Sequence, residues 1–277
     1  MITVRHLAIM QGRLLPPADG RIQAFPREHW EQEFPLAAAA GLGAIEWIYD
    51  THGLGANPLE SADGLMRLAA QSGAHRVAVR SICADYFMDF AFVRTTESER
   101  AKRVQHLIWL LGQAHVAGVT RVVLPFVDQS AIRDGADFET AADSLRQALP
   151  AAEHAGVELH IESSLPPAEF VRLLEQLSHP LVKVNYDSGN SSSLGYKPGE
   201  EFAAYGRRIG SVHIKDRLLN GGTVPLGQGD ADLPGVFQCL RDVDYSGDIV
   251  LQVARGTAGE EVEWARANRA FVERYLH

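Results

Sequence analysis

Three short apolar runs between Val157 and Lys215 decide the fold: VELHIES (157–163), LVKVNYD (181–187) and IGSVHIK (209–215). Each has the length and the β-branched content of a buried strand. Helix-length segments separate the runs, so strands and helices alternate along this stretch. Such alternation is typical of a parallel sheet in which helices make the crossover connections.

The same pattern extends over the rest of the chain. Five more apolar runs lie at residues 6–10, 43–47, 76–82, 121–126 and 248–254. Neighbouring runs are about 25 to 45 residues apart, the length of a strand, a helix and two loops. No Pro/Gly/Ser-rich linker divides the 277 residues. We therefore predict one domain over residues 1–277, a single (β/α)8 TIM barrel.

Local signals place the helix ends and the long loops. Gly73, Gly118 and Gly156 each precede an apolar run, where a left-handed residue is expected to close a helix. Thr96 and Glu99 have the spacing of a capping box at the start of a helix. The long loops over 11–26, 83–96 and 218–232 should lie on the catalytic rim, with CADYFMDFAF (83–92) as a pocket wall or lid.

Composition narrows the classes of partner. A net charge of -9 argues against a protein that neutralises many nucleic-acid phosphates, and favours a small polar substrate. Cys83 and Cys239 lack C-x-x-C spacing and are expected to be buried free thiols. The chain has no apolar run of bilayer length, and its start lacks the basic and apolar regions of a signal peptide. We expect a cytoplasmic protein that binds neither nucleic acid nor membrane.

Polar side chains stand at the carboxyl ends of the three central runs. They are Glu162, Asp187 and His213. Carboxyl ends of parallel strands converge on one rim of a barrel, so these three groups should meet there. Each could be a satisfied structural group on its own, but three at successive strand ends would suit a divalent metal ion.

The eighth run places Gln252 where a fourth ligand would come from. Its amide oxygen can coordinate a hard cation, or it can line the pocket and bind substrate hydroxyls. A set of mostly oxygen ligands with one nitrogen favours Mn²⁺ or Mg²⁺, with Co²⁺ and Zn²⁺ also possible.

Other rim residues are candidates for contact with substrate. Lys215 and Asp216 either act on the substrate, the lysine stabilising an enediolate or a phosphate, or form a salt bridge that orients the loop. Arg217 either binds a phosphate or sugar acid or is a solvated loop residue. Further pocket candidates, each equally compatible with a structural role, follow earlier strands: Gln11, Arg13, Glu46 and Arg80. In its structural role, Glu46 would form an ordinary ion pair with a rim arginine.

Taken together, several motifs resemble the xylose-isomerase-like TIM barrels, the sugar phosphate isomerase/epimerase superfamily. They are IES (161–163), YDSGN (186–190), VHIKDR (212–217), PLGQGDADL (225–233) and LQVAR (251–255). The resemblance implies a metal held by Glu162, Asp187, His213 and Gln252, a keto sugar that chelates it, and a dimer or tetramer. Asn190 matches a position that often contacts substrate in this family.

One departure from the family affects the expected reaction. In its ketose 3-epimerases the strand-eight position is a glutamate that works with the strand-five glutamate as a two-base pair, whereas Gln252 cannot take a proton. Glu162 is then the leading base next to the substrate carbonyl, with a second acid drawn from His160, Lys215, Asp216 or a metal-bound water.

Several functions remain open from the sequence. We expect a metal-dependent isomerase or epimerase of a ketose, sugar phosphate or polyol-derived ketone. The alternatives are a dehydratase of an inosose-like keto-cyclitol and a non-catalytic sugar-binding subunit that has kept the metal. An abasic-site endonuclease of the same superfamily would need additional metal-binding histidines and conflicts with the acidic charge.

Overall fold

The eight predicted strands form a closed parallel barrel. The structure is a computed structural model that describes Ile2 and residues 6–276, and its strands are hydrogen-bonded in the order β1-β10-β7-β6-β5-β4-β3-β2. Their bounds are β1 Leu7–Met10, β2 Ala44–Ile48, β3 Ala78–Cys83, β4 Arg121–Phe126, β5 Glu158–Ser163, β6 Val182–Asp187, β7 Ile209–Ile214 and β10 Asp248–Leu251. The prediction of a single (β/α)8 TIM barrel is confirmed.

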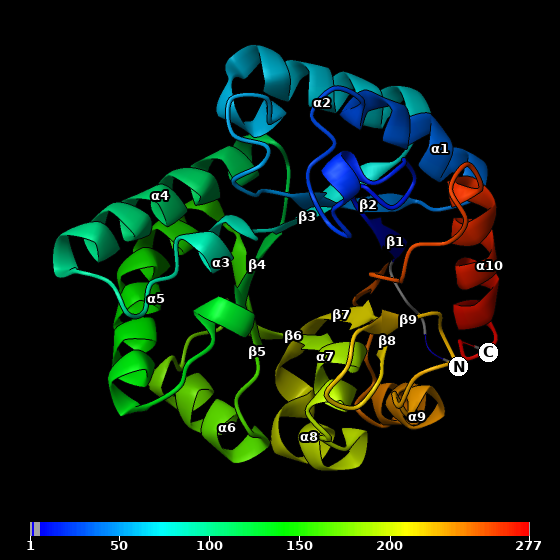
Figure 1. Cartoon of the computed structure of the whole chain (residues 1–277). Helices are drawn as coiled ribbons and strands as arrows, with labels where there is room; N and C mark the ends of the chain where they lie inside the picture. The colour runs from blue at the N-terminus through cyan, green and yellow to red at the C-terminus, as the bar shows by residue number, and fades with distance from the viewer. Residues whose placement is uncertain (1, 3–5, 277) are drawn as a thin grey trace.

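Helices surround the barrel on its outside, and an additional small hairpin, β8 Asp216–Arg217 with β9 Thr223–Val224, follows β7 (Figure 1). The helices are α1 Glu33–Ala40, α2 Ala62–His75, α3 Tyr86–Asp89, α4 Glu97–Val116, α5 Gly135–Ala155, α6 Pro167–Gln176, α7 Ser188–Ser193, α8 Pro198–Tyr205, α9 Leu233–Asp242 and α10 Glu261–Glu273. Among the described residues, no helix is both long and apolar enough to cross a bilayer.

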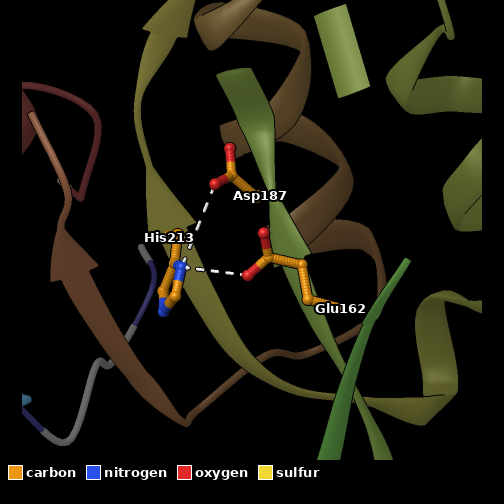
Figure 2. Close-up of side chains that lie close together, drawn as sticks. All are labelled: Glu162, Asp187 and His213. Atoms are coloured by element: carbon orange, nitrogen blue, oxygen red, sulfur yellow. Dashed lines mark ion pairs between the residues drawn. The ribbon is translucent and has the colours of Figure 1, made fainter. Parts of the chain in front are cut away.

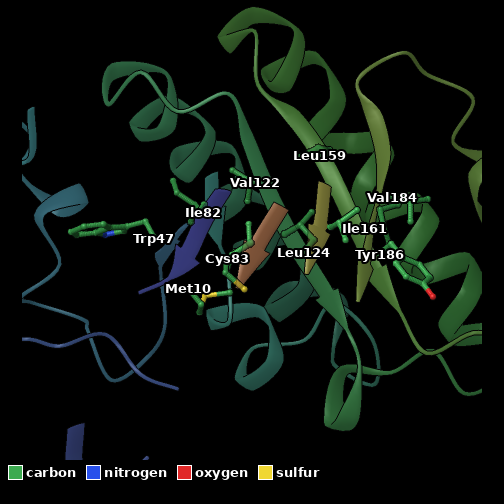
Figure 3. Packing of buried hydrophobic residues seen from close by; sticks show 14 of the residues in the cluster. Met10, Trp47, Ile82, Cys83, Val122, Leu124, Leu159, Ile161, Val184 and Tyr186 are labelled. Atoms are coloured by element: carbon green, nitrogen blue, oxygen red, sulfur yellow. The ribbon is translucent and has the colours of Figure 1, made fainter. Parts of the chain in front are cut away.

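The strands are buried on both faces, and the two faces differ in chemistry. Leu159, Ile161 and Val184 belong to the apolar core between the strands and the helices (Figure 3). The alternate positions of the same strands are polar and also buried, as at Glu162 and Asn185. Because side chains alternate between faces along a strand, the polar set points into the barrel. The core therefore lies outside the barrel wall, and the barrel interior holds polar groups.

The predicted helix ends are correct in two cases and wrong in one. Gly118 and Gly156 have φ of 72° and 64° where α4 and α5 end. Gly73 instead lies inside α2, which continues to His75 and is closed by Arg76 in the left-handed conformation at φ 54°. The helix therefore continues past its predicted end, through residues 74 and 75. The pairing of β3 begins only at Ala78, whose N–H donates to the Gly43 carbonyl.

The predicted capping box of α4 and the predicted burial of the two free thiols are each half correct. The Thr96 side chain accepts from the Glu99 N–H and so caps α4, whereas the Glu99 carboxylate pairs with Lys102 and Arg103 further along the helix. Both cysteines are free, but only Cys83 is buried.

Glu33 connects α1 to the loop that follows β1. Its Oε1 accepts from the N–H of Gly12 at 2.6 Å, and Gly12 has φ of 79°, a conformation that favours glycine. The Glu33 side chain is fully buried, and its Oε2 has no hydrogen-bond partner in the described part of the chain. Burial raises the pKa of Glu33 to about 7, although the hydrogen bond from Gly12 acts in the opposite direction.

We expect Glu33→Gln to flatten the pH dependence of stability. The folded state binds this proton more tightly than the unfolded state, so its contribution is complete below pH 4.5 and is lost as the pH rises through about 7. At ~1.4 kcal/mol for each pKa unit, the loss in the wild type is roughly 3 kcal/mol. Urea unfolding between pH 4.5 and 8 would measure it, with Glu28→Gln, an exposed glutamate, as the control. Parallel curves for the wild type and Glu33→Gln would contradict the expectation.

Candidate metal site and substrate pocket

A polar cavity of about 410 Å³ opens at the carboxyl ends of the strands. The three long loops contribute to its wall, as predicted, through residues such as Gln23, Asp85 and Thr223. The predicted site residues that line it are Arg13, Glu162, Asn190, Lys215, Arg217 and Gln252. The cavity thus lies where TIM barrels bind their substrates.

Glu162, Asp187 and His213 meet beside this cavity from the adjacent strands β5, β6 and β7 (Figure 2). Each offers one ligand atom, and the three atoms lie within 4.8 Å of one another. His213 Nδ1 is 3.4 Å from Glu162 Oε2 and 3.9 Å from Asp187 Oδ2. All three residues are buried, and two carboxylates with one imidazole could hold a divalent metal ion.

The other nitrogen of His213, Nε2, contacts a third carboxylate, that of Glu46, from across the barrel. Its Nε2 lies 2.6 Å from Glu46 Oε1, and both side chains are fully buried. Burial alone would lower the pKa of His213, but the charges of Glu46 and Glu162 raise it to about 10. Nε2 faces Glu46 while Nδ1 faces the two ligand carboxylates, and a carboxylate on the far nitrogen is the arrangement that orients metal-binding histidines.

This role of Glu46 was not predicted from the sequence. The two alternatives were a pocket residue and the partner of a rim arginine, and the structure pairs Glu46 with His213 instead. Strand alternation could have placed Glu46 inside the barrel, because the neighbours Ile45 and Trp47 belong to the apolar core.

Amide groups hold both ligand carboxylates in place. Asn185 Nδ2 donates to Glu162 Oε2 at 2.8 Å, and Asn190 Nδ2 donates to Glu162 Oε1 at 2.6 Å. Asp187 Oδ1 accepts from the backbone N–H groups of Gly189 and Asn190, which caps α7. Its Oδ2 stays directed at His213 and Lys215. The two carboxylates are thus oriented before any ligand binds.

Lys215 and Gln252 continue the polar wall of the cavity. The ammonium group of Lys215 lies 3.5 Å from Asp187 Oδ2 and 3.2 Å from both Asn190 Oδ1 and Gln252 Oε1. Gln252 Nε2 donates to Gln23 Oε1 at 3.1 Å. The amide oxygen of Gln252 therefore faces the lysine beside the metal cluster, and its amide nitrogen faces away.

Two arginines of the predicted set also reach the cavity. Arg13 donates to the carbonyls of Val253 and Ile22 and to Gln23 Oε1, and burial, followed by the charge of Arg255, lowers its pKa to about 9. Arg217 donates to Asn190 Oδ1 at 2.9 Å and twice to the Gly221 carbonyl. Both cations border the cavity, but most of their donors bind protein oxygens.

Two predicted site residues, His160 in β5 and Asp216 in β8, are not part of the cavity wall. His160 is fully buried below the metal cluster, between Ser211 Oγ at 2.7 Å and Glu158 Oε2 at 2.8 Å. Asp216 is also buried and accepts from the N–H groups of Gly227, Gly229 and Ala231. The salt bridge, one of the two alternatives for Lys215 and Asp216, is replaced by other contacts: Asp216 anchors the loop that follows β9, and Lys215 pairs with Asp187.

Gln11 and Arg80 are likewise absent from the cavity wall. Gln11 is fully buried, and its Oε1 accepts from the Ile48 N–H at 2.9 Å, which ties β1 to β2. Arg80 lies 3.4 Å from Asp248, the first residue of β10, so it belongs to the amino-terminal end of the barrel. The pairing of β2 with β3 shifts at this point and omits Arg80. The contacts of these two residues correspond to the structural role that the sequence left open for them.

Two cavity residues that we did not single out are Gln23 and Asp85. Gln23 Nε2 donates to Asp85 Oδ2 at 2.7 Å, and the Cys83 thiol donates to Asp85 Oδ1 at 3.2 Å. Burial raises the pKa of Asp85 to about 6. The available signal was the position of Asp85 only two residues after the end of β3, inside the stretch that we predicted to wall the pocket.

The fold and the site together define a class of protein, the TIM barrels in which side chains from adjacent strands form a candidate metal site at the barrel mouth. The family model described as "Xylose isomerase-like TIM barrel" matches residues 34–275, and the chain belongs to this family. The resemblance found in the sequence is thereby confirmed.

Curated relatives of the chain include a dehydratase and an epimerase. The chain is 26% identical over 165 residues to an inosose dehydratase of Geobacillus kaustophilus, covering 51% of this chain and about half, 54%, of that protein. It is 29% identical over 211 residues to a 2-epi-5-epi-valiolone 7-phosphate 2-epimerase of Actinoplanes sp., covering 74% of this chain and 75% of the relative.

Among solved structures, the chain is similar to the IOLI protein with a bound zinc atom. The TM-score is 0.78 at 19% identity, with 98% of this chain and 99% of that chain covered. This likeness supports the fold.

The contact between Glu46 and His213 predicts an effect on metal affinity. Glu46→Gln keeps a hydrogen-bond acceptor at Nε2 but removes the charge that makes His213 a better ligand, so Mn²⁺ affinity should fall about 10- to 100-fold. Calorimetric titration with Mn²⁺ would measure the change. Glu33→Gln is the matched control, because Glu33 is also fully buried but lies outside the metal cluster. Unchanged affinity in Glu46→Gln would contradict this role.

Proposed function

We propose that the protein is a metal-dependent isomerase or epimerase of a ketose, sugar phosphate or related polyol-derived ketone. The observation that carries this proposal is the position of Glu162, which belongs to the candidate metal cluster and also lines the cavity. A base in this position can remove a proton from the carbon next to a carbonyl. A divalent ion, when bound, would polarise that carbonyl and acidify the proton.

The surrounding residues suit a polyhydroxylated substrate. The cavity wall includes Asn190, Lys215, Arg217, Arg13 and Gln23. These groups supply hydrogen-bond donors for hydroxyl or phosphate oxygens. The epimerase relative named for a phosphorylated cyclitol ketone is in keeping with such a ligand.

Gln252 supports the second candidate, a dehydratase of an inosose-like ketone. A glutamine cannot exchange protons, so the strand-eight residue cannot serve as the second base of an epimerase. Removal of a hydroxyl group next to an enolised carbonyl requires no carboxylate at this position. The dehydratase relative named for inosose adds weight to this alternative. A non-catalytic metal-retaining sugar-binding subunit is the third possibility, and it predicts ligand binding without turnover.

We also propose the identity of the metal ion, the cellular location and the oligomeric state. The oxygen-rich ligand set, with Gln252 as a fourth ligand, favours Mn²⁺, with Mg²⁺, Co²⁺ or Zn²⁺ as alternatives. We propose a cytoplasmic location, and resemblance to the family suggests a homo-oligomer, a dimer or tetramer.

Exchange with solvent deuterium tests the proposed reaction and its base. In D₂O the wild type should place deuterium next to the carbonyl of its substrate in a panel of D-fructose, L-ribulose and an inosose. Glu162→Gln should lose both exchange and turnover, by about 10²-fold or more, because an amide cannot accept the proton. Mass spectrometry separates an unchanged carbon skeleton, as in an isomerase, from loss of water, as in a dehydratase.

The matched control for this experiment is Glu158→Gln, the same substitution in the same strand, since Glu158 pairs with His160 away from the cavity. It should retain exchange close to the wild-type rate. Activity of Glu162→Gln above about a tenth of wild type would remove Glu162 as the base. Binding of a panel sugar with neither exchange nor turnover would favour the non-catalytic subunit.

Removal of the metal should inactivate the protein. Treatment with EDTA is expected to abolish turnover of the panel substrate, and Mn²⁺ should restore it best, because the ligand carboxylates Glu162 and Asp187 suit a hard divalent ion. Metal analysis of the purified protein and Mn²⁺ calorimetry provide a readout that does not depend on activity. Full turnover in protein that contains and binds no divalent metal would contradict the ligand assignment.

A further inference from the structure

We propose that Asp85 is the second proton-transfer group of this pocket, acting together with Glu162. The inference rests on the proposed function and deepens it. Glu162 lies near the end of β5 and Asp85 follows β3, and both line the same cavity, with only β4 between their strands in the barrel. A substrate held in the cavity can therefore meet two carboxyl groups, which come from two different strands of the barrel wall.

The surroundings of Asp85 differ from those of a structural carboxylate. Within residues 6–276 no lysine, arginine or histidine side chain forms an ion pair with it. Its two oxygens accept from one amide, that of Gln23, and from one thiol, that of Cys83. The nearby cation Arg13 directs its donors to Val253, Ile22 and Gln23 instead. The carboxyl group is oriented but keeps its capacity to gain and lose a proton.

Burial and the neighbouring carboxylates favour the protonated form of Asp85. Burial is the largest cause of the rise in its pKa to about 6, and the negative charges of Asp50 and Glu162 add to it, while the hydrogen bonds from Gln23 and Cys83 act in the opposite direction. Burial, followed by the charge of Arg255, lowers the pKa of Arg13, and the charge of Asp85 only partly offsets this. A carboxyl group that titrates near neutral pH can act as an acid and return as a base.

A chain of side-chain amides connects Asp85 to the other side of the pocket. Gln23 donates to Asp85, and its Oε1 accepts from both Arg13 and Gln252. Arginine and lysine side chains can only donate hydrogen bonds. The Gln23 amide therefore turns its oxygen to Arg13, and the Gln252 amide turns its oxygen to Lys215, at 3.2 Å. The Gln252 amide then donates to Gln23, and the Gln23 amide donates to Asp85. Gln252 thus acts as a positioning residue for the carboxyl group that replaces a strand-eight acid.

The proton balance is complete for an epimerisation and for a dehydration. Glu162 takes the proton from the carbon next to the carbonyl, and the electron pair of the broken C–H bond forms an enediolate. In an epimerisation Asp85 then gives its proton to the same carbon from the other face, and a new C–H bond forms. In a dehydration the pair forms a C=C bond, the neighbouring C–O bond breaks, and the leaving hydroxide takes the Asp85 proton as water. Solvent returns both carboxyl groups to their starting states.

The test uses Asp85→Asn, which keeps the size of the side chain and an acceptor for Gln23. Wild type and variant are incubated in D₂O with the compound that the wild type converts among D-fructose, L-ribulose and an inosose. We expect turnover to fall about 10²-fold or more. Deuterium should still enter the recovered substrate, because Glu162 remains, and Mn²⁺ affinity should stay unchanged. The loss of kcat/KM in the wild type as the pH rises above about 6 should disappear in the variant.

Two further variants separate proton transfer from a structural role. Asp85→Glu should recover part of the turnover, and Asp63→Asn, the same change at an exposed residue of α2, should match the wild type. Two results would overturn the assignment of Asp85 but leave the proposed function standing. They are turnover by Asp85→Asn within about threefold of wild type, and loss of exchange together with turnover. A wild type that neither exchanges nor converts any panel compound overturns the proposed function and this assignment with it.

Discussion

The buried ion pair between Glu46 and His213 is the interaction on which the site depends. An isolated charge inside a protein is strongly unfavourable, so the imidazole and the carboxylates at the barrel mouth require partners on every side. Glu46 provides this partner from β2, across the barrel from β7, at 2.6 Å. It leaves Nδ1 of His213 directed at Glu162 and Asp187. The barrel wall and the candidate metal site are therefore stabilised by the same buried contact.

Strand alternation explains why so much of the site could be predicted from the sequence. Residues at every second position of β5, β6 and β7 point into the barrel, so Glu162, Asp187 and His213 were placed together before their distances were known. Alternation gives the face of a residue but not its height along the barrel axis. His160 points inward like Glu162 but lies two residues lower, where Ser211 and Glu158 enclose it.

Residues in loops and at irregular strand positions were harder to predict. Arg80 falls where the pairing of β2 and β3 shifts, and Asp216 is turned inward by three backbone N–H groups of a loop whose path depends on tertiary contacts. Gln23 and Asp85 lie in loops without periodicity, so no pattern could assign their direction. They meet in the cavity although 62 positions separate them along the chain.

The order of donors and acceptors around the cavity explains why a glutamine is compatible with position 252. A glutamate there would place an oxygen where Gln252 Nε2 now lies, 3.1 Å from Gln23 Oε1, and two acceptors would face each other. Rotation of the Gln23 amide would relieve this conflict only by turning its nitrogen towards the Arg13 guanidinium and its oxygen towards Asp85. Ionised Asp85 would then lose its amide donor, at a cost of about 1 to 3 kcal/mol for a buried group left without its hydrogen bond. Gln23, Asp85 and Gln252 are thus compatible with one another as a set, and a carboxyl group at position 85 is consistent with an amide at position 252.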